Sequence, residues 1–321
     1  MKFTRRTMAA ILASGTMAAA LISSGPASAM EFPTKPVRLV IPFGPGGSND
    51  TFGRILADRL GKLWGQTVVV ENRPGAGSTI GSAHVSQAKP DGHTLLFVSS
   101  SYVTAAATQT KLPYDPVKDL APVGYFGLTD LYMIVSKDLP VKNLADYKQE
   151  AEKRTVFGGA PGVGSISHFV QLMLIDTLGI KSEIVQHNSG GAVMTDIGGG
   201  RVDSYFGVVF EAANDAARPL VVMSNERSAA YPDVPTIIEE GYPDAVADLW
   251  YGVFAPGGTP EEVVTKINHD LAQAMKDAAE DPFIVTQGIK ISDAPPVEFA
   301  SRVKADIERW SAVAVKNGIR Q

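Results

Sequence analysis

Short apolar runs alternate along this chain with stretches whose apolar positions recur at helical spacing. Residues 37–41 (VRLVI) form an apolar run typical of a buried strand. The next apolar positions recur every three or four residues, as in an amphipathic helix, at Phe52, Ile55, Leu56, Leu60 and Leu63. Comparable runs predict further strands at 66–71, 94–98, 131–135, 155–157, 183–186 and 219–223. Helices are expected at 76–88, 141–153, 167–179, from 259 onwards and at 296–317. This alternation predicts an α/β fold with parallel sheets, whose ligands gather at the carboxyl ends of the strands.

The loop between the first strand and the first helix, residues 42–50 (PFGPGGSND), is the first candidate site. Its glycines permit a sharp turn and a close approach of the backbone to a ligand. Ser48 or Asn49 is expected to cap the helix. The free N–H groups and the helix dipole then favour an anion, most plausibly a carboxylate. An ordinary strand-to-helix turn is the alternative; the loop lacks the signatures of a nucleotide P-loop and of a dinucleotide fold.

A second loop, residues 158–165 (GGAPGVGS), repeats this arrangement before another helix. Two such loops suit a ligand clamped between two domains. A serine run at 99–101 follows the third strand, where it either donates hydrogen bonds to a ligand or caps the next helix. His168 lies in the first turn of the second helix; a histidine packed at a domain seam is favoured over a ligand contact or a pH-sensitive group.

Residues 1–29 have the form of a signal peptide. Lys2, Arg5 and Arg6 precede an apolar stretch at 8–22, and 27–29 (ASA) resembles a signal-peptidase site. The apolar stretch is too short for a stable membrane span. We therefore expect export to a bacterial periplasm with cleavage near Ala29, by the general or the twin-arginine route.

Composition narrows the function classes. The net charge is −5, and removing the signal peptide with its three basic residues takes it to −8, which argues against nucleic acid or an anionic membrane as partner. The chain has no cysteine, so neither a disulfide nor a thiolate is available. The five histidines lack metal-ligand spacing, and no nucleophile elbow is present. We expect no cofactor and no catalysis; a hydrolase or transferase is the weakly supported alternative.

About 290 residues remain after the signal peptide, which favours two domains. The runs at 131–135 and 249–256 are interpreted as crossings between them. This predicts a first domain at 30–130 and 251–321 and a second at 131–250.

Several motifs in order carry a resemblance to a known family. They are residues 32–47 (FPTKPVRLVIPFGPGG), 70–77 (VENRPGAG), 90–96 (PDGHTLL) and 112–123 (LPYDPVKDLAPV). The chain resembles the Bug (TctC-like) periplasmic receptors of tripartite tricarboxylate transport systems over nearly its whole exported length. The resemblance implies a two-lobed binding protein with the ligand in the cleft, held by backbone N–H groups, hydroxyls and waters of both loops. It also implies membrane transporter subunits as partners; we expect a monomer. A ligand-loaded partner of a signalling receptor stays an alternative.

The predicted ligand contacts are Phe43, Gly44, Gly46, Gly47, Ser48, Asp50, Ser100, Ser101, Val163, Gly164, Ser165, Ser167, His168, Asn188, Ser189 and Gly207. The chain departs from the family pattern at Asn188 and Ser189, where a Lys-Gly pair is usual. It also departs at Gly207, where many relatives carry an aspartate able to meet an amino group. That absence argues against an amino-acid ligand; aliphatic di- and tricarboxylates and aromatic carboxylates stay open.

Overall fold

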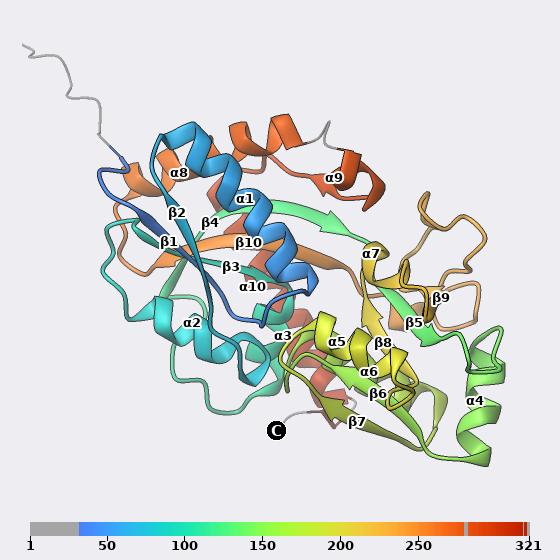
Figure 1. Ribbon diagram of the computed structural model, residues 1–321. Helices are drawn as coiled ribbons and strands as arrows, with labels where there is room; N and C mark the ends of the chain where they lie inside the picture. Colours follow the sequence, from blue (N-terminus) through green and yellow to red (C-terminus); the bar gives the residue numbers. More distant parts are fainter. Residues whose placement is uncertain (1–31, 279–281, 317, 320–321) are drawn as a thin grey trace, which may run out of the picture. The chain divides into compact units, whose positions relative to one another are not determined.

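Two β-sheets with helices packed against them form the described part of the chain in this computed structural model (Figure 1). The structure describes residues 32–278, 282–316, 318 and 319, so the expected signal peptide lies outside the described residues. Residues from Pro33 onwards form one compact unit that contains both sheets. The predicted α/β class is therefore confirmed.

The first sheet has the strand order β11-β4-β10-β3-β1-β2. Its strands are β1 (Val37–Ile41), β2 (Val68–Asn72), β3 (Thr94–Ser99), β4 (Leu120–Thr129), β10 (Leu249–Pro256) and β11 (Lys290–Ile291). β1 pairs in parallel with β2 and β3, whereas β10 is antiparallel to β3 and β4. β11 is antiparallel to β4. The sheet is thus parallel only in part, because β4 leads the chain towards the second sheet and β10 brings it back in the opposite direction.

The second sheet has the order β7-β6-β8-β5-β9. Its strands are β5 (Tyr132–Ser136), β6 (Val156–Ala160), β7 (Ser182–Gln186), β8 (Ser204–Gly207) and β9 (Ala217–Val222). β6 is parallel to β7 and β8, and β5 is antiparallel to β8 and β9. Both sheets therefore combine a parallel part, as expected, with antiparallel strands that the sequence pattern does not predict.

Helices follow most of the strands. They are α1 (Ser48–Trp64), α2 (Thr79–Ser86), α3 (Ser101–Thr108), α4 (Leu144–Lys153), α5 (Ile166–Leu178), α6 (Gly190–Gly198), α7 (Val209–Ala212), α8 (Glu261–Ala278), α9 (Pro282–Thr286) and α10 (Pro296–Lys316), with short 3-10 turns η1 (Ala76–Ser78) and η2 (Pro243–Ala245). Figure 1 shows α1, in blue, leading away from the end of β1. The starts of α1, α5 and α6 are used in the site described below.

The core beneath α1 is aromatic. The rings of Phe52 and Tyr251 lie 5.0 Å apart, and those of Phe97 and Phe126 lie 5.4 Å apart. Edge-to-face pairs of this kind add to the free energy gained by burial. A separate buried cluster in the second sheet includes Tyr132, Ile134, Val193, Ile197, Tyr205 and Val222. These clusters fix the starts of α1 and α6 relative to their own sheets.

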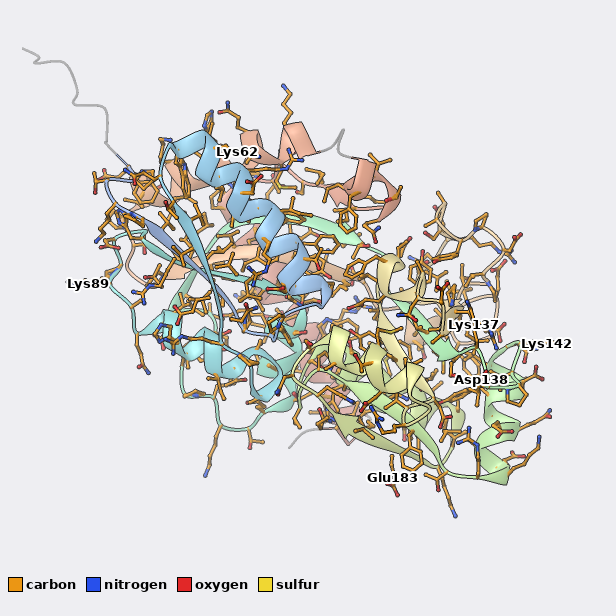
Figure 2. All side chains as sticks on the ribbon, in the orientation of Figure 1. Lys62, Lys89, Lys137, Asp138, Lys142 and Glu183 are labelled. Atoms are coloured by element: carbon orange, nitrogen blue, oxygen red, sulfur yellow. The ribbon has the colours of Figure 1, made fainter. Side chains whose placement is uncertain are left out.

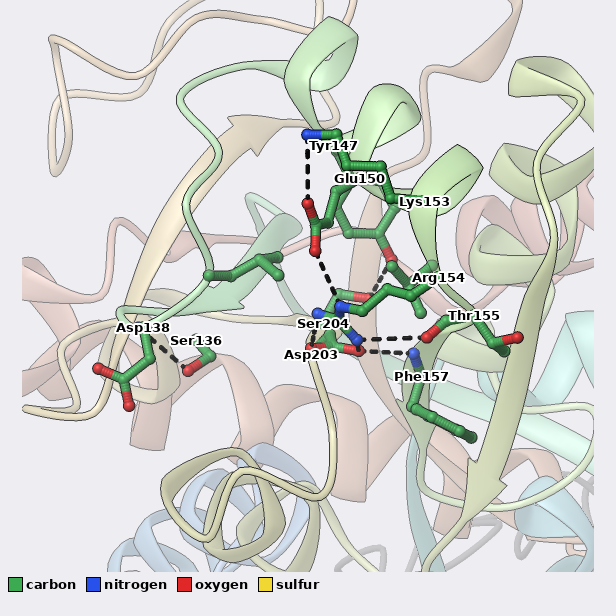
Figure 3. A network of polar contacts seen from close by, with 12 residues as sticks. Ser136, Asp138, Tyr147, Glu150, Lys153, Arg154, Thr155, Phe157, Asp203 and Ser204 are labelled. Carbon is green, nitrogen blue, oxygen red and sulfur yellow. Dashed lines mark hydrogen bonds and ion pairs between the residues drawn. The ribbon is translucent and has the colours of Figure 1, made fainter.

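A charged network lies at the starts of β6 and β8 in the second sheet (Figure 3). The guanidinium of Arg154 donates to both carboxylate oxygens of Asp203, at 2.7 and 3.0 Å, and to Glu150 at 2.8 Å. Asp203 also accepts from the backbone N–H of Phe157 at 2.8 Å. The network ties the end of α4 to β6 and to the residue that precedes β8.

Many other charged side chains project outwards. Figure 2 labels Lys62, Lys89, Lys137, Lys142 and Glu183, all of which are exposed. Exposed surface charges, paired or not, contribute little to stability.

Candidate functional site

A small cavity is lined by elements of both sheets. Its volume is about 20 Å³. Its lining residues are Phe43, Gly47, Ser48, Asn49, Ser99, Ser101, Pro161, Ile166, Ser167, Gly190, Tyr205, Phe206, Gly207 and Leu249. Such a volume holds about one water molecule, so a larger solute requires the walls to separate.

The β1–α1 loop forms one wall. Gly46 has φ +85°, a left-handed conformation that glycine adopts readily. Gly47 is the N-cap residue, and no side chain caps the helix, so the predicted capping by Ser48 or Asn49 is wrong. The reason is that Asn49 turns to the neighbouring strand, where its side-chain oxygen accepts from the backbone N–H of Ser99 at 3.0 Å. The first N–H groups of α1 are consequently left for other acceptors.

Asp50 braces this loop and does not line the cavity. Its carboxylate accepts hydrogen bonds from the backbone of Gly46 at 3.1 Å and from Asn72 and Arg54, both at 2.9 Å. Burial alone would raise the pKa of Asp50, but these hydrogen bonds hold that pKa below its usual value. Asn72 also donates to the carbonyl of Phe43 at 3.0 Å. Asp50 therefore positions the loop in which Phe43 reaches the cavity.

The serine run after β3 is divided between two environments. Ser101 lines the cavity, and its hydroxyl accepts from the backbone N–H of Ile166 at 3.0 Å. The N–H group of the first residue of α5 is thereby bound by the side chain of the first residue of α3. Ser100 is fully buried outside the lining, and its hydroxyl has no hydrogen-bond partner. Its backbone N–H donates to Trp250 at 2.8 Å.

The β6–α5 loop forms the opposite wall. Ser165 caps α5 by accepting from the backbone N–H three residues onwards at 3.2 Å. Gly164 has φ +84°, and its carbonyl accepts from the hydroxyl of Thr104 at 2.9 Å. Val163 does not line the cavity; its carbonyl oxygen lies only 2.2 Å from where a Cβ of Gly77 would be. This loop therefore packs tightly against η1.

Two further predicted contacts lie in the first turn of α5. Ser167 lines the cavity and donates to the carbonyl of Phe206 at 2.6 Å. The Nδ1 atom of His168 accepts from the backbone N–H of Gly164 at 3.2 Å. Burial lowers the pKa of His168 to about 4, so the ring is neutral at neutral pH. The geometry agrees with the favoured interpretation of His168 as a packed histidine.

The β7–α6 loop meets the first loop through its backbone. The carbonyl of Asn188 accepts from the N–H of Gly44 at 2.7 Å, while the residue itself is exposed. Ser189 caps α6 by accepting from the N–H of Ala192 at 3.2 Å. Neither side chain lines the cavity. The contribution of this segment to the lining is the first residue of α6, Gly190.

Glu211, which the sequence analysis does not predict, lies beside the cavity. Only 3% of it is exposed. Its Oε2 accepts from the backbone N–H of Val208 at 3.0 Å and its Oε1 from that of Ser48 at 3.3 Å. Burial raises the pKa of Glu211 to about 7, although these hydrogen bonds and one with Tyr205 oppose the rise. A carboxylate of the chain therefore uses an N–H of α1 that the sequence analysis assigns to the ligand.

Two glycines make room for this carboxylate. A Cβ on Gly190 would lie 2.2 Å from Oε1 of Glu211, and a Cβ on Gly207 would lie 2.5 Å from Oε2. Both glycines line the cavity. The carboxylate of Glu211 therefore lies against position 207, where the sequence pattern has no acid.

The remaining lining residues are absent from the predicted set: Asn49, Ser99, Pro161, Ile166, Gly190, Tyr205, Phe206 and Leu249. Most have no distinctive sequence signal. Glu211 does have one, because it is the only acid in the otherwise apolar segment 205–213 (YFGVVFEAA). An acid in such a segment is seldom buried unless it is hydrogen-bonded or has a role.

Within the described residues, no three His, Asp or Glu side chains are grouped so as to hold a metal ion. No helix in the same part of the chain has both the length and the apolar character needed to cross a membrane.

Comparisons with known proteins agree with this architecture. Residues 52–319 match the family described as "Tripartite tricarboxylate transporter family receptor". The periplasmic binding protein BugD is similar, with a TM-score of 0.83 and 28% identity over 90% of this chain and 99% of BugD. MatC from Rhodopseudomonas palustris, solved with malate, has a TM-score of 0.84 and 31% identity over 88% of this chain and 99% of MatC. Another R. palustris protein, solved with adipate, has a TM-score of 0.83 and 29% identity over 89% of this chain and 98% of its own. The chain belongs to the family of tripartite tricarboxylate transporter receptors, periplasmic binding proteins that include the Bug proteins.

Proposed function

We propose that this chain binds a small organic solute through a carboxylate, holds it without chemical change, and delivers it to a tripartite tricarboxylate type membrane transporter. The observation that carries the proposal is that three helices begin at one cavity. Ser48 of α1, Ile166 of α5 and Gly190 of α6 all line it. Helix starts present backbone N–H groups and the positive end of the dipole, which together favour an anion. In this structure the N–H groups of Ser48 and Ile166 donate to Glu211 and Ser101, so the proposal needs these bonds to open when the solute enters.

The proposal places the solute between two lobes, each built on one sheet. The first lobe would comprise residues 30–130 and 251–321 and the second 131–250, with the crossings acting as hinges. Support comes from direct contacts between the two segments, such as the bond from Gly44 to Asn188 and the bond from Ile166 to Ser101. Single hydrogen bonds of this kind can form and break as the lobes close and open.

Malate and adipate, in the two R. palustris proteins, support a carboxylate as the recognised group. The predicted contacts that line the cavity in this chain are Phe43, Gly47, Ser48, Ser101, Ser167 and Gly207. We propose these as direct ligand contacts. Asp50, Ser165, Ser189 and Gly164 would act by holding the loops in place.

Isothermal titration calorimetry with carboxylates and their matched amides tests this function. We expect one carboxylate to bind and its amide to bind at least tenfold more weakly. A carboxylate at 100 times its dissociation constant should also stabilise the fold by about 2.7 kcal/mol. If no carboxylate binds, or if the amide binds equally well, the carboxylate function is refuted.

Gly47→Ala provides a test of the site itself. Gly47 has φ −96°, which any residue tolerates, yet a Cβ there would lie 2.9 Å from the backbone nitrogen of Gly190. The variant should fold normally but close poorly, and its affinity should fall at least tenfold. Gly198→Ala is the matched control, because its Cβ would make an ordinary contact of 3.6 Å with Ala216. Equal loss of affinity in both variants would contradict the assigned cleft.

A further inference from the structure

The carboxylate of Glu211 is buried without a positive partner. Its hydrogen-bond donors are two backbone N–H groups and the hydroxyl of Tyr205. The other titratable group near it is Tyr251, which is fully buried. No lysine, arginine or histidine among the described residues forms an ion pair with it. A buried ionised carboxylate is costly unless a positive charge compensates it.

The cavity itself also lacks a basic side chain. No lysine, arginine or histidine is among its lining residues. His168, close by in α5, is neutral at neutral pH because burial lowers its pKa to about 4. Among the described residues that line the cavity, the positive potential therefore comes from helix starts, each equivalent to about half a charge.

Charge balance then limits what the site can hold. A solute with two carboxylates would bring two negative charges next to a third, on Glu211. A solute with one carboxylate and one ammonium group brings no net charge. Its carboxylate can lie at the starts of α5 and α6, and its ammonium group can supply the cation that Glu211 lacks.

The geometry allows this contact. Gly190 and Gly207 line the cavity, and the carboxylate of Glu211 occupies the space that side chains at these positions would fill. The bond from Ser48 to Oε1 joins α1 to α7, two helices that follow strands of different sheets. Separation of the lobes would break that bond and expose Oε1 to an entering solute.

We propose that Glu211 is a specificity-determining residue, which binds the protonated amino group of a small solute that also carries a carboxylate. This inference rests on the proposed carboxylate-binding function and names the solute class: amino acids, including those with the amino group on a distal carbon.

Calorimetry with matched pairs tests it: alanine and lactate, β-alanine and 3-hydroxypropionate, γ-aminobutyrate and 4-hydroxybutyrate, and aspartate and malate. We expect one amino compound to bind at least tenfold more tightly than its hydroxy partner. In Glu211→Gln that ratio should collapse to within threefold, whereas the exposed Glu183→Gln should keep it. Melting curves of both variants verify that they fold.

Release of protons to the buffer on binding provides a second, independent test. Binding of an ammonium group to Glu211 should release protons near pH 7, which calorimetry in phosphate and in Tris measures from the difference in heat. Glu211→Gln should abolish that release.

The outcomes separate the two proposals. If hydroxy acids or dicarboxylates bind as tightly as the amino compounds, or if Glu211→Gln keeps the ratio, the role of Glu211 is refuted and carboxylate binding stands. If none of these compounds and no carboxylate of the wider panel binds, both proposals fail.

Discussion

Glu211→Gln is expected to stabilise the protein at alkaline pH and to do much less at acidic pH. Burial raises the pKa of this carboxyl from 4.5 to about 7. Below pH 4.5 the group is protonated in both the folded and the unfolded chain, and it costs the fold nothing. As the pH rises from 4.5 to 7, the unfolded chain ionises this group while the folded chain keeps it protonated, so stability is lost until the folded group ionises as well. At about 1.4 kcal/mol for each pKa unit, the loss approaches about 3 kcal/mol above pH 8.

Glutamine has the shape of the protonated acid and never ionises. It keeps one oxygen to accept a backbone N–H, and its NH₂ group stands where the acid carries its hydroxyl. Any cost of that NH₂ group near a backbone donor is therefore similar at all pH values. The free energy of unfolding of Glu211→Gln, minus that of the wild type, should grow by about 3 kcal/mol between pH 4.5 and pH 8.5, or roughly 6 °C in Tm. This growth isolates the contribution of the ionisation.

Urea unfolding of the wild type and of Glu211→Gln across this pH range measures the difference. Subtracting the two curves cancels the contribution of His168, whose lowered pKa acts in the opposite direction over the same range. Glu183→Gln, at an exposed position of β7, is the control and should change stability by less than about 0.5 kcal/mol. A difference in free energy of unfolding that does not grow with pH would refute the claim that burial raises the pKa of Glu211.

Three further predictions follow from the contacts described above. His168→Asn should make stability less sensitive to acid. The buried ring, with its pKa lowered to about 4, contributes stability that is present above pH 6.5 and is lost as the pH falls towards 4. Melting curves of the variant and the wild type from pH 4 to 7 measure the difference. Asp203→Asn should cost about 1–2 kcal/mol in urea unfolding, because a charged pair with Arg154 is lost, while Lys142→Gln, outside this network, should cost almost nothing. Asp50→Asn should weaken ligand binding several-fold by loosening the loop at Gly46, and an unchanged dissociation constant would contradict the bracing role.

The local pattern of apolar and polar residues was sufficient to predict many of the strands and helices. The strand at 37–41 and the last helix were predicted to within one residue, because each has an uninterrupted period and clear flanking signals. The long strand β4 was missed. It contains Pro122, Gly124 and Gly127, which interrupt the apolar run, and it is held in place by the pairing with β10 rather than by its own propensity.

The site was harder to predict because its contacts join distant segments. The two glycine loops were located from sequence, since the glycines and the helix that follows are adjacent in the chain. The bond between Ser48 and Glu211 spans 163 positions, and no local signal connects them. The cap of α1 was misassigned for the same reason: Asn49 is bound by a strand 50 positions away.

The bond from Gly44 to Asn188 joins two backbones, and the close approach of Gly47 to Gly190 depends only on missing side chains. Closure of the proposed cleft thus rests partly on contacts that need no particular side chain, beside the bond from Ser48 to Glu211. An engineer who wants a fluorescent biosensor for a new solute can therefore exchange cavity side chains other than Glu211, such as Ser167, while these backbone contacts, and with them the closing motion and the optical signal, are retained.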